Sequence, residues 1–123
     1  MVLKSDKKIS EASSHLERAL ALYRAQGKDS DLFFLTVAKA FEVLVEYCWK
    51  DLKGRVQDEG LDAPSPKEAV RQATRLGIIT NPEKWIDCIN ARNDSVHDYF
   101  SIPKKDYIKL AGQMLGLAKG VYK

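Results

Sequence analysis

The sequence has few residues that interrupt regular secondary structure or could cross-link the chain covalently. Four prolines and seven glycines occur among 123 residues, and most of them fall between segments of regular apolar spacing. The two cysteines, Cys48 and Cys88, have no CxxC or cysteine–histidine partner, which excludes a zinc site of the usual spacing. We expect both to be buried free thiols in a reducing compartment.

Long hydrophobic runs and a strong excess of one charge are also missing. Lys39, Glu42 and Glu46 interrupt the most apolar stretch, so it cannot span a membrane. The first eight residues are polar and lack the apolar core of a secretion signal. We therefore expect one cytoplasmic domain over residues 1–123.

The charge balance is only mildly basic. Twenty Lys and Arg residues stand against 17 Asp and Glu residues, a formal net charge of +3. Dedicated DNA-binding domains usually carry more positive charge, although a few placed cations suffice for a local RNA or phosphate site. Gly-rich phosphate loops, paired-carboxylate metal motifs and nucleophile elbows are absent from the sequence, so we expect no metal and no cofactor.

Apolar residues recur every three or four positions, which predicts helices and no strands. Ser65 and Glu68 form a capping box at one helix start. Ser30 or Asp29 is expected to cap an earlier helix, and Asn81, followed by proline, a later one. Glycines that tolerate a left-handed backbone are expected to end the first three helices: Gly27, Gly60 and Gly77. The five predicted helices cover residues 6–26, 31–57, 66–76, 81 to between 97 and 100, and 103–123.

The second predicted helix is apolar on almost every side. Such a helix lies at the centre of a bundle or is shared with a partner subunit. Because short connections favour antiparallel neighbours, we predict an all-α, up-and-down antiparallel bundle of four main helices plus one short helix. The apolar residues of this helix are Leu32, Phe33, Phe34, Leu35, Val37, Phe41, Val43, Leu44, Val45, Tyr47 and Trp49.

The polar end of the fourth helix carries the residues best suited to chemistry. Arg92 lies at helical spacing from four apolar residues and is expected to share their face and point inward. An inward arginine is costly unless it has a partner or lines a pocket. His97 follows five residues later, about 140° around an ideal helix, so the two meet only at a helix end or bend, or across a dimer. The four apolar residues are Trp85, Ile89, Val96 and Tyr99.

These residue types could cleave an RNA backbone without a metal. His97 can take or give a proton near neutral pH, and the planar fork of Arg92 can hold a phosphate. Asn93 and Ser95 add neutral hydrogen-bonding groups. A base would activate the ribose 2′-hydroxyl for attack on the adjacent phosphate, and the arginine would stabilise the charge on its oxygens. Alternatively, His97 is there because a cation is favourable at a helix C-terminus.

Two further sets of charged residues each allow a structural and a functional interpretation. Glu42, Glu46 and Lys50 follow one another at spacings of four on the second helix. They form a structural ion-pair line, or one of the two carboxylates contacts the Arg92–His97 segment and orients it. Lys104 and Lys105 form a solvated helix end or contact an RNA backbone.

The segment Arg92-Asn93-x-x-x-His97-x-Tyr99 resembles the signature of HEPN domains, specifically of the nucleotidyltransferase substrate-binding family. The resemblance runs from about Leu16 to the C-terminus. Further matching residues are Phe41-Glu42, Glu46, Trp49-Lys50, Leu52-Lys53, Gly60, Ser65-Pro66-Lys67-Glu68, Gly77-Ile78-Ile79 and Trp85. One difference is that the family commonly has Thr-Ser before the histidine, where this chain has Ser95-Val96.

The resemblance implies a bundle that forms a homodimer, with two motifs across a shared cleft. Members are typically encoded beside a minimal nucleotidyltransferase. One group acts as toxins, metal-independent ribonucleases in which the motif's arginine and histidine are catalytic. Here these would be Arg92 and His97, with Asn93 as the polar neighbour. In some systems the partner transfers AMP to the motif's tyrosine, which here would be Tyr99.

Three functions remain open from the sequence. The first is the ribonuclease toxin of a toxin–antitoxin pair, with Arg92 and His97 catalytic. The second is a non-catalytic subunit that binds a nucleotide or substrate for a nucleotidyltransferase in the same cleft. The third is a helical module whose apolar second helix serves dimerisation alone. The supporting site residues would be Asn93, Ser95, Glu42 and Glu46.

Overall fold

The computed structural model describes residues 4–27 and 30–122, and the regular elements within these ranges are all helical. None of the helices described there is both long and apolar enough to cross a membrane. The predicted cap Asp29 and the last residue, Lys123, lie outside the described residues. The elements are α1 (Lys4–Leu22), the π-helical η1 (Tyr23–Gly27), α2 (Asp31–Asp58), α3 (Pro66–Arg75), α4 (Pro82–His97) and α5 (Lys104–Val121).

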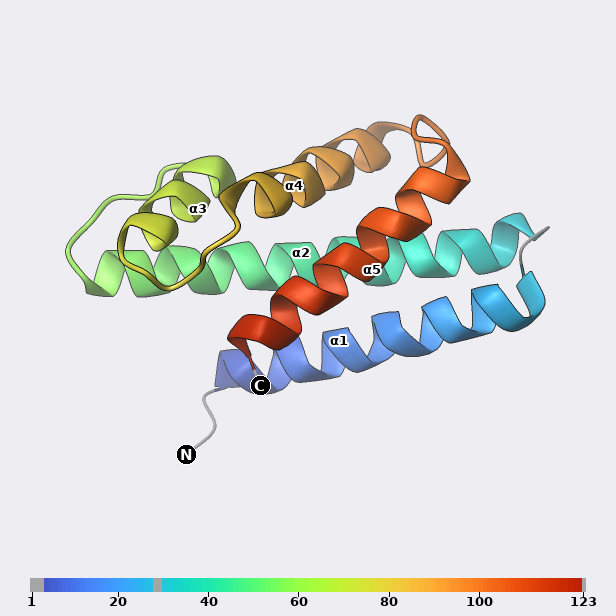
Figure 1. Ribbon diagram of the computed structural model, residues 1–123, viewed down its shortest axis with the longest axis horizontal. Coiled ribbons are helices and arrows are strands. Elements are labelled where there is room, and N and C mark those ends of the chain that lie inside the picture. Colours follow the sequence, from blue (N-terminus) through green and yellow to red (C-terminus); the bar gives the residue numbers. More distant parts are fainter. Residues whose placement is uncertain (1–3, 28–29, 123) are drawn as a thin grey trace.

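Helix α2 is the centre of the bundle and contacts α1, α3, α4 and α5. Figure 1 shows α1 and α2 running in opposite directions, followed by α4 and α5, which also reverse direction. The short α3 covers the C-terminal part of α2. The predicted up-and-down helical bundle is therefore confirmed, with helix boundaries within a few residues of those expected.

The apolar stripes of the long helices meet on α2. Aromatic rings fix α5 to it: the Tyr107 ring lies edge-on to Phe34 and Phe41, with centroids 5.4 and 5.2 Å away. This packing holds the start of α5, and with it the loop after α4, against the N-terminal half of α2. The residues of α1 and η1 that the sequence placed in the core are all buried: Ile9, Ala12, Leu16, Ala19, Leu20 and Tyr23.

Two of the three predicted helix caps are confirmed. The Ser65 hydroxyl accepts from the backbone N–H of Glu68 at 3.1 Å, and the Ser30 hydroxyl accepts from that of Phe33 at 3.4 Å. Asn81 precedes α4 as expected, but its side chain makes no capping hydrogen bond. Its backbone, at φ −119° and ψ 67°, lacks the extended conformation that aims a cap side chain at the helix N–H groups.

Gly27, Gly60 and Gly77 close or follow the first three helices as predicted, but the left-handed backbone expected at Gly27 is wrong. Gly60 and Gly77 have φ values of 82° and 77°, the left-handed backbone that favours glycine. Gly27 is not in that region. A Cβ added there would lie 2.5 Å from the Cβ of Phe33, so close packing is what requires a glycine at this position.

Candidate functional site

Arg92, in the C-terminal half of α4, is held by two neighbours. Its Nη2 lies 3.2 Å from Oε2 of Glu46 on α2, and its Nη1 donates to Oδ1 of Asn93 at 3.2 Å. The side chain is 31% exposed, so it lies at the edge of the bundle. A guanidinium has five N–H donors, and two contacts leave others for an anion. Arg92 therefore has a fixed orientation and remaining capacity to bind phosphate.

Glu46 gathers three donors at this site. Its Oε2 also accepts from Nε1 of Trp49 at 3.0 Å, and its Oε1 pairs with Nζ of Lys50 at 3.0 Å. Burial opposes ionisation of Glu46, but the hydrogen bonds from Trp49 and Lys50 and the charge of Arg92 outweigh it and lower its pKa. The structure thus contains both contacts that the sequence offered as alternatives, the ion pair along α2 and the contact to Arg92.

Trp49 is the residue of this group that sequence reasoning missed. The apolar pattern assigned it to the hydrophobic surface of the helix, yet it is half-buried and its N–H contacts the carboxylate that orients Arg92. The available signal was its position three residues after Glu46, one helical turn away.

A buried polar cluster lies on the inner side of the motif. Glu42 is 9% exposed, and its Oε1 lies 3.1 Å from the hydroxyl of Ser95, which is 1% exposed. The Tyr99 hydroxyl donates to Oε2 of the same carboxylate at 3.3 Å. Burial, the charge of Glu42 and the hydrogen bond to it raise the pKa of Tyr99. The cluster ties the end of α4 to the middle of α2.

Helix α4 presents only part of the face that the sequence predicted: Trp85 and Ile89 are buried as expected. Val96 is 52% exposed, so it does not share an inward face with Arg92. Tyr99 lies beyond the helix, because α4 ends at His97 and Asp98 has an extended backbone. The buried face of α4 continues through the small residues Ala91 and Ser95 and does not include Val96. The buried residues of α4 are Trp85, Cys88, Ile89, Ala91 and Ser95.

His97, the last residue of α4, is exposed. Within residues 4–27 and 30–122, no hydrogen bond or ion pair joins its ring to another side chain, Arg92 included. The structure therefore gathers Arg92, Asn93 and Glu46 into one group and Glu42, Ser95 and Tyr99 into another. His97 stands apart from both groups.

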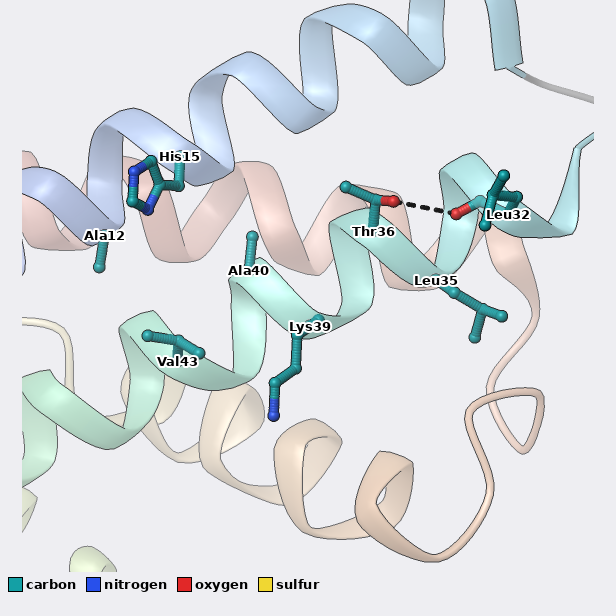
Figure 2. A pocket seen from close by; sticks show the side chains of 8 residues that line it. All are labelled: Ala12, His15, Leu32, Leu35, Thr36, Lys39, Ala40 and Val43. Atoms are coloured by element: carbon teal, nitrogen blue, oxygen red, sulfur yellow. Dashed lines mark hydrogen bonds between the residues drawn. The ribbon is translucent and has the colours of Figure 1, made fainter.

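A separate apolar groove of about 460 Å³ follows the outer face of α2. Figure 2 shows this face of α2 between α1 and α4, with α5 behind. Leu32, which the sequence counted as apolar helix surface, is 72% exposed here. The groove contains none of the motif residues, and a partner shared through this face stays a prediction. Its lining is Ala12, His15, Leu32, Leu35, Thr36, Lys39, Ala40 and Val43.

The two lysines at the start of α5 have different surroundings. Lys104 pairs with Asp31 and lies 5.7 Å from the ring centroids of Phe34 and Phe100. It therefore fastens the start of α5 to the start of α2. Lys105 is exposed, and its contact with an RNA backbone stays a prediction.

The chain matches a known protein family over most of its length. A family model described as "nucleotidyltransferase substrate binding protein like" matches residues 6–111 of the 123-residue chain. The match includes both groups around the motif and His97. A search of curated proteins found no match.

Proposed function

The chain belongs to the nucleotidyltransferase substrate binding protein-like family, and we propose that it is a cytoplasmic, metal-independent ribonuclease, the toxin partner of a minimal nucleotidyltransferase. The observation that carries this proposal is the Arg92 site. A guanidinium oriented by Glu46 and Asn93 lies at the bundle edge, five residues before the exposed imidazole of His97. These two residue types suit binding of a phosphate and transfer of protons.

In the proposed reaction His97 acts as the general acid–base and Arg92 as the phosphate-binding residue. Neutral His97 takes the proton of a ribose 2′-hydroxyl, whose oxygen attacks the adjacent phosphorus. The bond to the 5′-oxygen breaks, that oxygen receives a proton from the imidazolium, and a 2′,3′-cyclic phosphate remains. Arg92 stabilises the negative charge that develops on the phosphate oxygens.

The proposal includes a second copy of the chain. Within one chain Arg92 and His97 do not touch, so each motif lacks a complete reaction site. Val96 and Phe100, on either side of His97 in the sequence, are 52% and 50% exposed. Burying such side chains against another copy is favourable, and a homodimer would place two motifs across one cleft.

A second candidate function is a non-catalytic subunit that binds a nucleotide or substrate for a nucleotidyltransferase. One observation favours it. Catalytic histidines are usually oriented by a second group that fixes their tautomer, and His97 has no such contact within the described residues. Arg92 would then bind a phosphate without cleavage following.

The partner nucleotidyltransferase is proposed to silence the toxin by transferring AMP to Tyr99. The Tyr99 hydroxyl already donates to Glu42. When the phenol oxygen attacks the α-phosphorus of ATP bound by the partner, Glu42 is placed to accept the proton as pyrophosphate leaves.

The test is cleavage of a short single-stranded RNA in the presence of a chelator, after intact mass has established that the chain carries no AMP. Wild type is expected to give fragments ending in a 2′,3′-cyclic phosphate, and His97→Ala and Arg92→Ala are expected to give none. His15→Ala is the matched control, because His15 is the other histidine of the chain and is also exposed. Cleavage by His97→Ala at the wild-type rate contradicts the ribonuclease proposal.

The same proteins separate the second candidate from the first. If wild type cleaves no RNA but binds a nucleotide, and Arg92→Ala loses that binding, the non-catalytic function is supported. If wild type neither cleaves RNA nor binds a nucleotide, both functions are contradicted.

A further inference from the structure

The indole of Trp49 is oriented by the same atom that holds Arg92. Trp49 Nε1 donates to Oε2 of Glu46 at 3.0 Å, and Arg92 Nη2 lies 3.2 Å from that oxygen. One carboxylate therefore keeps an aromatic ring from α2 and a guanidinium from α4 side by side. The indole and the phosphate-binding candidate are neighbours at the seam between the two helices.

Two lysines of α2 lie in the same group as the indole. Nζ of Lys53 lies 6.0 Å from the centroid of the Trp49 ring, and Lys50, whose side chain is 60% exposed, pairs with the other oxygen of Glu46. Arg92 and Lys50 pair with the Glu46 carboxylate and Lys53 lies near the Trp49 ring, so the group includes three cations. In the described part of the chain, Glu46 is the one acidic group in ion-pair contact with any of these three cations. The group thus carries an excess of positive charge.

The other tryptophan shows what a structural indole looks like in this fold. Trp85 is 2% exposed and belongs to the core. Trp49 is half-buried, with its N–H turned to Glu46 and an ammonium group over its ring. A face of the Trp49 ring therefore lies against a charged side chain, unlike the ring of Trp85 within the core.

We propose that Trp49, Lys50 and Lys53 form a base-stacking subsite for single-stranded RNA beside the phosphate bound by Arg92. An aromatic plane stacks with any nucleobase, and cations beside it follow the phosphate backbone. In the complex the base takes the position of the Lys53 ammonium, which moves to a phosphate of the strand. The substrate is single-stranded because a base paired in a helix cannot reach the indole. This inference rests on the proposed role of Arg92 as the phosphate-binding residue.

The fluorescence of Trp49 provides a direct test. The chain has two tryptophans, so Trp85→Phe leaves Trp49 as the single indole, and His97→Ala in the same chain keeps the RNA intact during titration. Circular dichroism checks that this double variant is folded. Short oligouridylate RNA is expected to quench the fluorescence saturably, with a Kd that rises with salt. Duplex RNA at the same concentrations is expected to leave it unchanged.

Affinity for labelled oligouridylate, measured by fluorescence anisotropy, tests the residue itself. Trp49→Ala is expected to weaken binding by about 5- to 100-fold, the range for loss of one stacked base. Trp49→Phe retains an aromatic plane and is expected to bind within a few-fold of wild type. Tyr47→Ala is the matched control, since Tyr47 is a 38% exposed aromatic on the same helix whose ring faces Lys8 instead. It is expected to bind like wild type.

The possible failures are distinguishable. If oligouridylate binds but leaves Trp49 fluorescence unchanged, or if Trp49→Ala binds as tightly as Tyr47→Ala, the stacking subsite is wrong and the ribonuclease proposal stands. If quenching occurs but cleavage by His97→Ala equals that of wild type, the stacking subsite stands and the ribonuclease mechanism is wrong. If no form of the protein binds the RNA, both are wrong.

Discussion

Glu46 and Arg92 are joined across two helices, with 3.2 Å between Oε2 of the carboxylate and Nη2 of the guanidinium. The contact links the middle of α2 to the C-terminal half of α4. Because Trp49 and Lys50 donate to the same carboxylate, one side chain positions three others. Changes at Glu46 should therefore be visible both in the stability of the bundle and in the chemistry of the site.

Glu46→Gln is expected to lower the free energy of unfolding by about 0.5–1 kcal/mol at neutral pH, because the ion pair is partly exposed and screened. The pKa of Glu46 is lowered in the folded chain. Burial raises this pKa, but the hydrogen bonds from Trp49 and Lys50 and the charge of Arg92 lower it by more. Its contribution is therefore complete above the unfolded pKa of about 4.3 and is lost as pH falls through the folded pKa.

Urea unfolding of both proteins at several pH values measures this difference. The gap between wild type and Glu46→Gln should begin to close as pH falls below about 4.3 and should disappear once pH is below the lowered pKa of Glu46. Glu68→Gln is a suitable control, since Glu68 forms a surface ion pair with Arg71 on α3, away from the motif. A gap that stays constant over this pH range would show that Glu46 does not stabilise the fold through its charge.

The fold could be predicted because its determinants are local. Helical periodicity set the buried face of α1, and Ser65 and Gly77 set the limits of α3 through contacts within a few residues. Where the determinant is a contact with another helix, the prediction gave the wrong physical reason. Gly27 was expected to adopt a left-handed backbone, but the close approach of Phe33 on α2 is what requires a glycine there.

The site was predictable only in part for the same reason. The motif could be recognised from residue types and spacing, whereas the contact from Glu46 to Arg92 was only one of several alternatives that the sequence left open. The burial of Ser95 could not be anticipated, because it depends on a hydrogen bond to Glu42, 53 residues earlier in the chain. Periodicity also identifies apolar residues without showing whether they are covered, so it placed Val96 on a buried face and gave Trp49 no role at the site.

Ser65→Ala is expected to lower the free energy of unfolding by about 1 kcal/mol, because the Glu68 N–H loses the hydroxyl that caps α3. Ser30→Ala should cost less, since the bond from Phe33 to the Ser30 hydroxyl is longer, 3.4 Å against 3.1 Å. Thermal and urea unfolding of the two variants gives the comparison. Equal or reversed losses would mean that the two caps do not contribute according to their geometry.

Two glycine-to-alanine changes should have opposite signs. A Cβ at Gly27 would lie 2.5 Å from the Cβ of Phe33, an atom attached to the backbone, so Gly27→Ala is expected to destabilise the fold by about 1–3 kcal/mol. At Gly116 in α5 an added Cβ meets nothing within 4 Å, and Gly116→Ala is expected to stabilise the helix by about 0.5–1 kcal/mol. Urea unfolding measures both, and destabilisation by Gly116→Ala would show that this face of α5 is covered in solution.

Tyr99→Phe is expected to prevent AMP transfer by a co-expressed minimal nucleotidyltransferase, because it removes the accepting oxygen. Burial, with the charge of Glu42 and the hydrogen bond to it, raises the pKa of Tyr99, so the hydroxyl is protonated at neutral pH and needs a base. Glu42→Gln keeps a hydrogen-bond acceptor but loses the base, and it should slow the transfer. Intact mass should show AMP on wild type and on the control Tyr47→Phe. AMP on Tyr99→Phe would contradict the assignment, and full modification of Glu42→Gln at the wild-type rate would remove Glu42 from the reaction.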